Sequence, residues 1–146
     1  MIAIGNNKIA DNVISFDSNL FEGNIGYFKI AETSYRPAED LEEGNQRHLS
    51  LLCTGGGNYA DNEDAPVFCN LCIHRGGVKT NYNTLTGVTY LNFYYRINNG
   101  MCELWVSPKK QFPDFISILV LKNNFNRWTV GNLEQSRELP DGLVDF

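Results

Sequence analysis

The stretch "VTYLNFYYRINNGMCELWVS", residues 88–107, decides the fold class of this chain. Residues 88–96 and 101–107 are rich in β-branched and aromatic side chains, which fit the pleated surface of a β-strand. Between them, Asn98, Asn99 and Gly100 tolerate the positive φ angles that a tight hairpin turn requires. The stretch therefore predicts two antiparallel strands joined by a short turn.

The same strand signals recur on both sides of this hairpin. Helical periodicity is nearly absent, and the only candidate is a single turn at residues 36–45, "RPAEDLEEGN". Apolar or alternating runs predict further strands at residues 12–16, 26–33, 47–54, 66–75, 115–122 and 126–130. About eight short strands without intervening helices are typical of an antiparallel β-sandwich. We therefore expect an all-β, jelly-roll-like sandwich.

The charge and composition of the chain limit the classes of partner that it is expected to bind. The chain has 146 residues, enough for one domain with its own core, and a net charge of −5. Non-specific nucleic-acid binding needs concentrated lysine and arginine, so we expect no nucleic-acid partner. The longest apolar run, "FISILVL" at 115–121, is far shorter than the roughly 20 residues of a membrane-spanning helix. We therefore expect no membrane insertion.

The first residues differ in character from the rest. They do not show the basic segment and apolar core of a secretory signal peptide. Residues 1–24 alternate glycine, asparagine and aspartate with single apolar residues, as an extended connector does. We expect a linker at 1–24 and a β-sandwich domain at 25–146.

The segment "VFCNLCIHRGG", residues 67–77, contains Cys69 and Cys72. A structural zinc site usually needs a second such pair, which the sequence lacks. Because side chains alternate along a strand, we expect Cys69 and Cys72 on opposite faces, with His74 beside Cys72. We interpret both as free thiols of a protein that folds in a reducing cytosol, with a metal site and a disulfide as the alternatives.

Residue types used in catalysis are present, but not in the patterns that catalysis needs. His48 and His74 lie in strand candidates, and no Gly-x-Ser-x-Gly elbow surrounds a serine. Acidic runs at 39–43 and 61–64 are typical of solvated loops, with a glycosidase pair or a calcium site as alternatives. The glycine-rich stretch at 53–62 lacks the Lys-Ser/Thr pair and helix of a phosphate-binding loop. We expect no catalytic residue, metal or cofactor.

Two Gly- and Asn-rich stretches, residues 54–65 and 76–87, are predicted to be long irregular loops. Each contains one tyrosine beside asparagine or aspartate. Flat aromatic rings pack against sugars, while planar amides and charged groups bind their hydroxyls, so both loops are candidates for carbohydrate binding. The candidate residues are Asn58, Tyr59, Asp61, Arg75, Asn81, Tyr82 and Asn83. In the alternative interpretation, the tyrosines cap the ends of the sandwich.

The order of the strands resembles that of a known group of proteins. The segments "GYFKIAET", "HLSLLCTGGG", "PVFCNLCIHRGG", "YYRINNGMCELWVSPKKQFPDFISILVL", "RWTVGNL" and "LPDGLVDF" follow one another over residues 26–146. An aromatic-Lys-Ile-Ala stretch, here at 27–31, and a dipeptide such as Leu104-Trp105 after the hairpin are frequent in that group. In these features the chain resembles the C-terminal β-sandwich of bacteriophage tail fibres, tailspikes and related appendage proteins.

The resemblance implies a non-enzymatic homotrimer at the distal end of a fibre, assembled in the host cytoplasm and located in the virion tail. Residues 1–24 are then the exit from a fibre shaft. Its partner is a bacterial surface polysaccharide or another host receptor. Two alternatives stay open: a trimerisation or folding domain without a ligand, and a self-cleaving or glycan-degrading module. The residues that the resemblance places in the core are Tyr27, Phe28, Ile30, Leu104, Trp105, Ile118, Val120 and Trp128.

Overall fold

The computed structural model describes residues 3–4, 7–8, 13–35, 47–57, 66–74, 77–84 and 90–146. Its strands form two antiparallel five-stranded sheets and a separate two-stranded hairpin. Across the first sheet, the strands are β3 (Val13–Asp17), β10 (Pro113–Asn123), β5 (Arg47–Gly57), β6 (Val67–His74) and β7 (Gly77–Thr84). Across the second sheet, they are β11 (Thr129–Ser136), β4 (Tyr27–Ser34), β9 (Met101–Pro108), β8 (Leu91–Asn98) and β12 (Val144–Asp145). The hairpin consists of β1 (Ala3–Ile4) and β2 (Asn7–Lys8), and a 3-10 turn, η2 (Asn124–Asn126), precedes β11.

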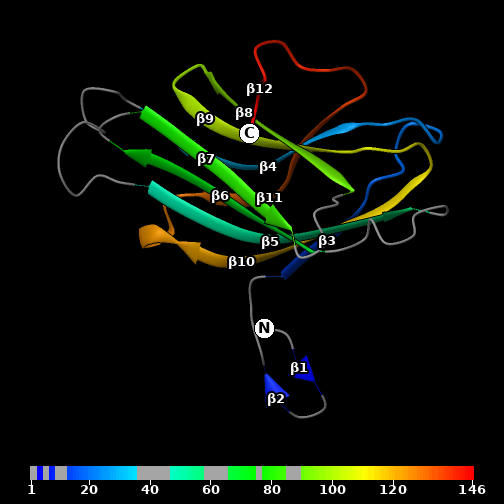
Figure 1. Ribbon diagram of the computed structural model, residues 1–146, viewed down its shortest axis with the longest axis horizontal. Coiled ribbons are helices and arrows are strands. Elements are labelled where there is room, and N and C mark those ends of the chain that lie inside the picture. Colours follow the sequence, from blue (N-terminus) through cyan, green and yellow to red (C-terminus); the bar gives the residue numbers. More distant parts are fainter. Residues whose placement is uncertain are drawn as a thin grey trace.

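The two large sheets enclose a hydrophobic core. Figure 1 shows the first sheet in front of much of the second, whose strands β4 and β11 are fainter because they are more distant. Along β6, every second side chain is buried between the sheets, as expected for a strand with one inward face. The predicted all-β antiparallel sandwich is confirmed, with two sheets of five strands rather than about eight strands in all. None of the described residues belongs to a helix long and apolar enough to cross a membrane.

The predicted hairpin is the pair β8–β9 in the second sheet. These strands pair in unbroken register from Leu91 opposite Pro108 to Asn98 opposite Met101. At the turn, Asn99 and Gly100 have φ angles of 51° and 74°, values that asparagine and glycine adopt more readily than other residues. Because a two-residue turn sets which residues face each other, the turn sequence also determines the register of the pair.

The prediction of an irregular loop at residues 76–87 is wrong, because most of this stretch is a strand. Residues 77–84, within the stretch 76–87, form β7 and pair with β6 along their whole length. The strand was hidden because β7 is an edge strand of mostly polar residues, so it lacks an apolar alternation. In the other predicted loop, β5 continues as far as Gly57. Residues 58–65 and the predicted helical turn at 36–45 lie outside the described residues.

Cys69 and Cys72 lie on opposite faces of β6, as predicted. Cys69 is buried in the core together with Cys53, whereas Cys72 lies on the outer face with His74. Burial raises the pKa of the Cys53 thiol to about 12, and it raises the pKa of Cys69 well above its ordinary value. Metal ligation and nucleophilic attack both need a thiolate. The two core cysteines therefore act as small apolar side chains.

The C-terminal segment lies over part of the outer face of the second sheet. Trp105 is fully buried there, and its indole N–H donates to the Glu103 carboxylate at 2.9 Å. Arg96 donates to the same carboxylate and lies 5.3 Å from the centre of the Trp105 ring. Lys29 approaches Glu103 to 3.6 Å. Arg96 also donates to the main-chain oxygen of Asp141 at 3.0 Å, which holds the C-terminal segment over this face.

The burial predicted for core residues is largely confirmed. Trp105 is buried, but on the outer face of β9 rather than between the sheets. Val120 is partly buried against the core. Tyr27 is partly exposed and lies beside Tyr94, with ring centroids 6.3 Å apart. The core between the sheets contains the other five: Phe28, Ile30, Leu104, Ile118 and Trp128.

Candidate functional site

Tyr82 lies at one open edge of the sandwich. In the β6–β7 pairing it is opposite the core residue Cys69, so its side chain points toward the second sheet. Because β7 is an edge strand, the Tyr82 side chain stays 47% exposed. Its ring stacks on Phe93 of β8, with centroids 6.3 Å apart and the planes inclined by 30°. Tyr82 thus contacts both sheets while part of its ring faces solvent.

A cleft of about 200 Å³ opens beside this ring. Phe146 packs against Phe93 at a centroid distance of 5.8 Å, so three aromatic rings lie in series. Asn92, Lys109 and Asp145 also line the cleft. Asn92 precedes Phe93 on β8 and Asp145 lies opposite Tyr94, so alternation directs both of these side chains toward the outer face of the second sheet. The residues of this site, called the Tyr82 cleft below, are Tyr82, Leu91, Asn92, Phe93, Lys109, Asp145 and Phe146.

The main chain fixes the polar wall of the cleft. The N–H of Lys109 donates to the Tyr90 carbonyl at 2.8 Å, and the N–H of Phe146 donates to the Phe93 carbonyl at 3.2 Å. The Lys109 side chain is exposed, and within the described residues no carboxylate lies at ion-pair distance from it. Its ammonium group is therefore free to bind an anionic or hydroxyl group that enters the cleft.

The structure does not bring Tyr82 together with its two predicted partners. Asn81 and Asn83 precede and follow it on β7, and alternation places both on the outer face of the first sheet. Asn81 accepts a hydrogen bond from the side chain of Asn70 at 2.9 Å. Asn83 is exposed and lies opposite Phe68. A loop allows three neighbours to converge, whereas a strand separates them, so this grouping depended on the wrong loop prediction.

The other predicted candidates cannot be placed. Asn58, Tyr59, Asp61 and Arg75 lie outside the described residues. Their assignment to carbohydrate binding stays a prediction from the sequence.

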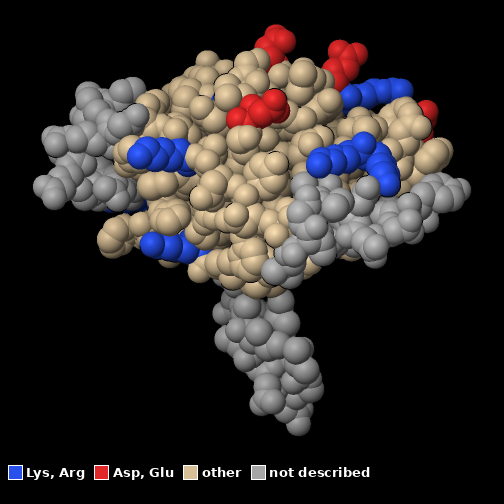
Figure 2. Space-filling view, in the orientation of Figure 1, with Lys and Arg blue, Asp and Glu red and all other residues tan. Residues whose placement is uncertain are grey.

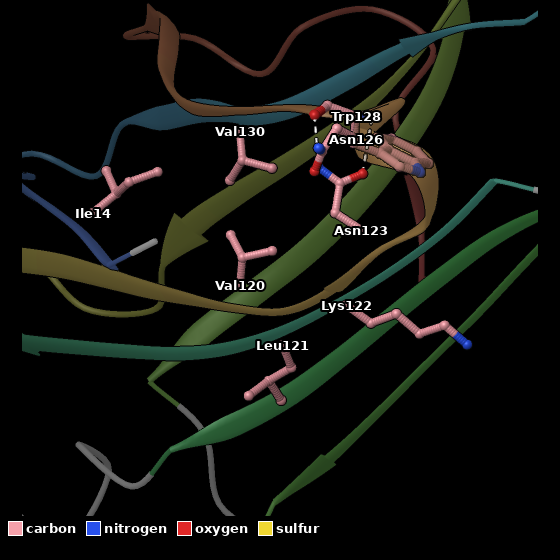
Figure 3. Close-up of a pocket in the computed structure, with 8 residues that line it drawn as sticks. All are labelled: Ile14, Val120, Leu121, Lys122, Asn123, Asn126, Trp128 and Val130. Atoms are coloured by element: carbon pink, nitrogen blue, oxygen red, sulfur yellow. Dashed lines mark hydrogen bonds between the residues drawn. The ribbon is translucent and has the colours of Figure 1, made fainter. Parts of the chain in front are cut away.

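A second pocket, of about 410 Å³, lies at the opposite edge of the sandwich, between β10 and β11. Figure 3 shows Val120 and Val130 facing each other across it, while the side chain of Lys122 extends away. The Asn123 side chain bonds both the N–H and the carbonyl of Trp128, at 3.0 and 2.8 Å. Because the amide of Asn123 is engaged and much of the lining is aliphatic, this pocket suits carbohydrate less well than the Tyr82 cleft.

Among the printed contacts of the described residues, His48 is not paired with a carboxylate. His48 lies on the outer face of the first sheet, with its Nε2 atom 3.3 Å from Ser50 Oγ. Burial and then the positive charge of Lys122 lower the pKa of His48. Nowhere in the described ranges do three or more His, Cys, Asp or Glu side chains gather in a way that could hold a metal ion.

Several residues of the Tyr82 cleft were missed in the sequence. Phe93 and Phe146 are 53 positions apart in number and meet only because β12 returns to pair with β8. Lys109 belongs to the Lys109-Lys110 pair, the one basic doublet of the chain. The sequence showed this pair but did not indicate where it lies in the fold. Long-range strand pairing supplied the missing information.

Comparison of the chain with models of known protein families, with curated proteins and with solved structures found no match.

Proposed function

We propose that this chain is a non-enzymatic recognition domain that binds a bacterial surface glycan through the Tyr82 cleft. The observation that carries the proposal is a partly exposed aromatic ring stacked on Phe93, in a cleft also lined by the polar residues Asn92, Lys109 and Asp145. The apolar face of a sugar packs against such a ring, and the polar groups bond its hydroxyls. The cleft is small, so it suits one or two sugar units.

The location proposed for the domain is the distal end of a bacteriophage tail fibre or tailspike, in the virion. The strand order that resembles this group supports the proposal, and so does the two-sheet fold that carries the cleft. In a homotrimer, three copies of one weak site act together, and the gain in avidity needs no new contact. A small cleft in each copy is then sufficient for stable adsorption to a cell surface.

Glycan binding can be tested on an array of bacterial capsular polysaccharides and lipopolysaccharide O-antigens. We expect at least one glycan to bind, and Tyr82→Ala to weaken its binding about tenfold or more. Phe125→Ala is the matched control, because Phe125 is 81% exposed, lies on η2 and does not line the cleft. Equal binding by Tyr82→Ala and the unsubstituted chain would reject the cleft as the site.

The alternative function, a trimerisation domain without its own ligand, is favoured by a different observation. An apolar row crosses the outer face of the first sheet, with Val13 opposite Leu119, Leu119 opposite Leu52, and Leu52 opposite Phe68. Val13 and Phe68 are 37% and 38% exposed. Light scattering tests self-association. A trimer that binds no glycan on the array supports this alternative. A monomer contradicts this alternative and also the homotrimer of the first proposal.

A further inference from the structure

The outer face of the first sheet carries a hollow that belongs to neither the Tyr82 cleft nor the apolar row. It has a volume of about 490 Å³ and is called the Lys79 hollow below. Its lining residues are His48, Asn70, Cys72, Lys79, Thr80 and Asn81. Strand register builds the site: His48, Cys72 and Lys79 form one row across three strands, and Ser50, Asn70 and Asn81 form the next. Lys122 of β10 lies opposite Ser50 and extends that second row.

A directed chain of hydrogen bonds runs along the hollow. The hydroxyl of Ser50 donates to Asn70 Oδ1 at 2.7 Å, so at 3.3 Å it accepts from Nε2–H of His48. Asn70 Nδ2 in turn donates to Asn81 Oδ1 at 2.9 Å. Each group polarises the next, and the chain ends on the amide N–H groups of Asn81. The open end of the chain therefore presents donors.

Positive charge lies on both sides of these donors. Lys79 and Lys122 are exposed, and neither forms an ion pair within the described residues. Their charges reach the middle of the hollow, since both act against the burial that raises the pKa of Cys72. Figure 2 shows basic side chains near the end of this face where β7 begins and β10 ends, with no acidic side chain drawn between them. Two exposed cations beside these donors favour an anionic ligand at this place.

We propose that the Lys79 hollow binds the anionic group of an acidic polysaccharide, with Lys79 and Lys122 as cations and Asn81 as the neutral donor. The shared chemistry is an anionic oxygen group, either a carboxylate or a phosphate. The hydroxyl and amide groups between the lysines fit the sugar hydroxyls beside that anion. DNA is disfavoured, because it carries a charge about every 1.7 Å along its axis and the acidic chain repels such a density.

The test measures binding of the full chain to four probes at low salt: polygalacturonate, a polymer of carboxylates; wall teichoic acid, a polymer of phosphates; neutral dextran; and double-stranded DNA. Binding to polygalacturonate identifies a carboxylate ligand, and binding to teichoic acid identifies a phosphate ligand. We expect the double substitution Lys79→Gln, Lys122→Gln to weaken that binding about tenfold or more. Absence of binding to both anionic polysaccharides, or equally tight binding to DNA, overturns the proposal.

The matched control is the double substitution Lys110→Gln, Arg137→Gln, which removes the same charge from positions outside the hollow. We expect it to leave binding unchanged, whereas an equal loss would show a response to net charge alone and overturn the site. The inference does not depend on the proposed function, since Tyr82→Ala is expected to leave polygalacturonate or teichoic-acid binding intact.

An independent readout is the titration of His48, followed by NMR. An anion beside the ring favours the charged imidazolium, so the pKa of His48 is expected to rise when the anionic probe that binds is added. The double substitution Lys79→Gln, Lys122→Gln, titrated with the same probe, serves as the control. A His48 pKa that stays constant at saturation would place the anion elsewhere and contradict the proposal.

Discussion

The two outer faces of this sandwich use similar residues in opposite ways. On the second sheet, Lys29 and Arg96 surround a buried carboxylate, Glu103, and the C-terminal segment covers them. On the first sheet, Lys79 and Lys122 stand exposed beside amides and hydroxyls, without an ion pair in the described part of the chain. A closed network stabilises the fold, whereas an open one is free to bind. Basic residues alone do not reveal which role applies; the presence of an internal carboxylate does.

The largest effect is expected from opening the closed network. Glu103 is only 4% exposed, and Glu103→Ala leaves Arg96 and the Trp105 indole without their shared acceptor and removes one of the carboxylates near Lys29. We expect a loss of about 3 kcal/mol in the free energy of unfolding, measured by urea denaturation. Glu134→Gln is the control, because the Glu134 side chain is half exposed and should cost little. A loss no larger than that of the control would mean that the network does not stabilise the fold.

The second-largest effect is expected on the stability of the fold at low pH. Burial alone raises the pKa of Glu103, but bonds from Arg96 and Trp105 and the charge of Lys29 lower it below its ordinary value. A carboxyl with a lowered folded pKa stabilises the fold above its unfolded pKa, and this contribution is lost as pH falls through the folded pKa. We therefore expect stability to fall below pH 4.5 in the unsubstituted chain. Urea denaturation of Glu103→Gln at the same pH values should give a shallower fall, and parallel curves would refute the role of Glu103.

The smallest effect is expected on the outer face of the first sheet. Burial and then Lys122 lower the pKa of His48. Lys122→Gln removes the second cause and keeps the first, so the pKa should rise part of the way toward its ordinary value of 6.5. NMR titration of the imidazole measures the change, and Lys110→Gln provides a control. An unchanged His48 pKa would show that the charge of Lys122 does not reach the Lys79 hollow.

Local signals in the sequence were enough for most of the fold. The Asn99-Gly100 turn and its flanking aromatic residues predicted the β8–β9 hairpin, and alternation around Cys69 and Cys72 predicted both faces of β6. β7 was not predicted, because a polar edge strand shows no alternation of apolar and polar residues. Trp105 was predicted to lie in the core, but it is fully buried on the outer face of β9, because its neighbours there, such as Arg96, come from other strands.

The candidate site was predicted only in part, for the same reason. Tyr82 was identified from its type and its polar neighbours, but its partners Phe93, Lys109 and Phe146 come from strands far away in the sequence. Asn81, chosen as its neighbour, lies instead in the Lys79 hollow on the other side of β7. A strand places adjacent residues in different sites, and only the pairing of β7 with β6 revealed which residue belongs to which.

We propose that this sandwich recognises a bacterial surface glycan at its open surfaces and not over the closed network. The most direct test is an NMR titration of the chain with a polysaccharide that binds it on the array. We expect shifts in the backbone signals of Tyr82, Phe93, Lys109 and Phe146, with none at Trp105 or Arg96. Shifts confined to Trp105 and Arg96, or no shift at Tyr82 when binding is saturated, would rule out glycan binding in the Tyr82 cleft.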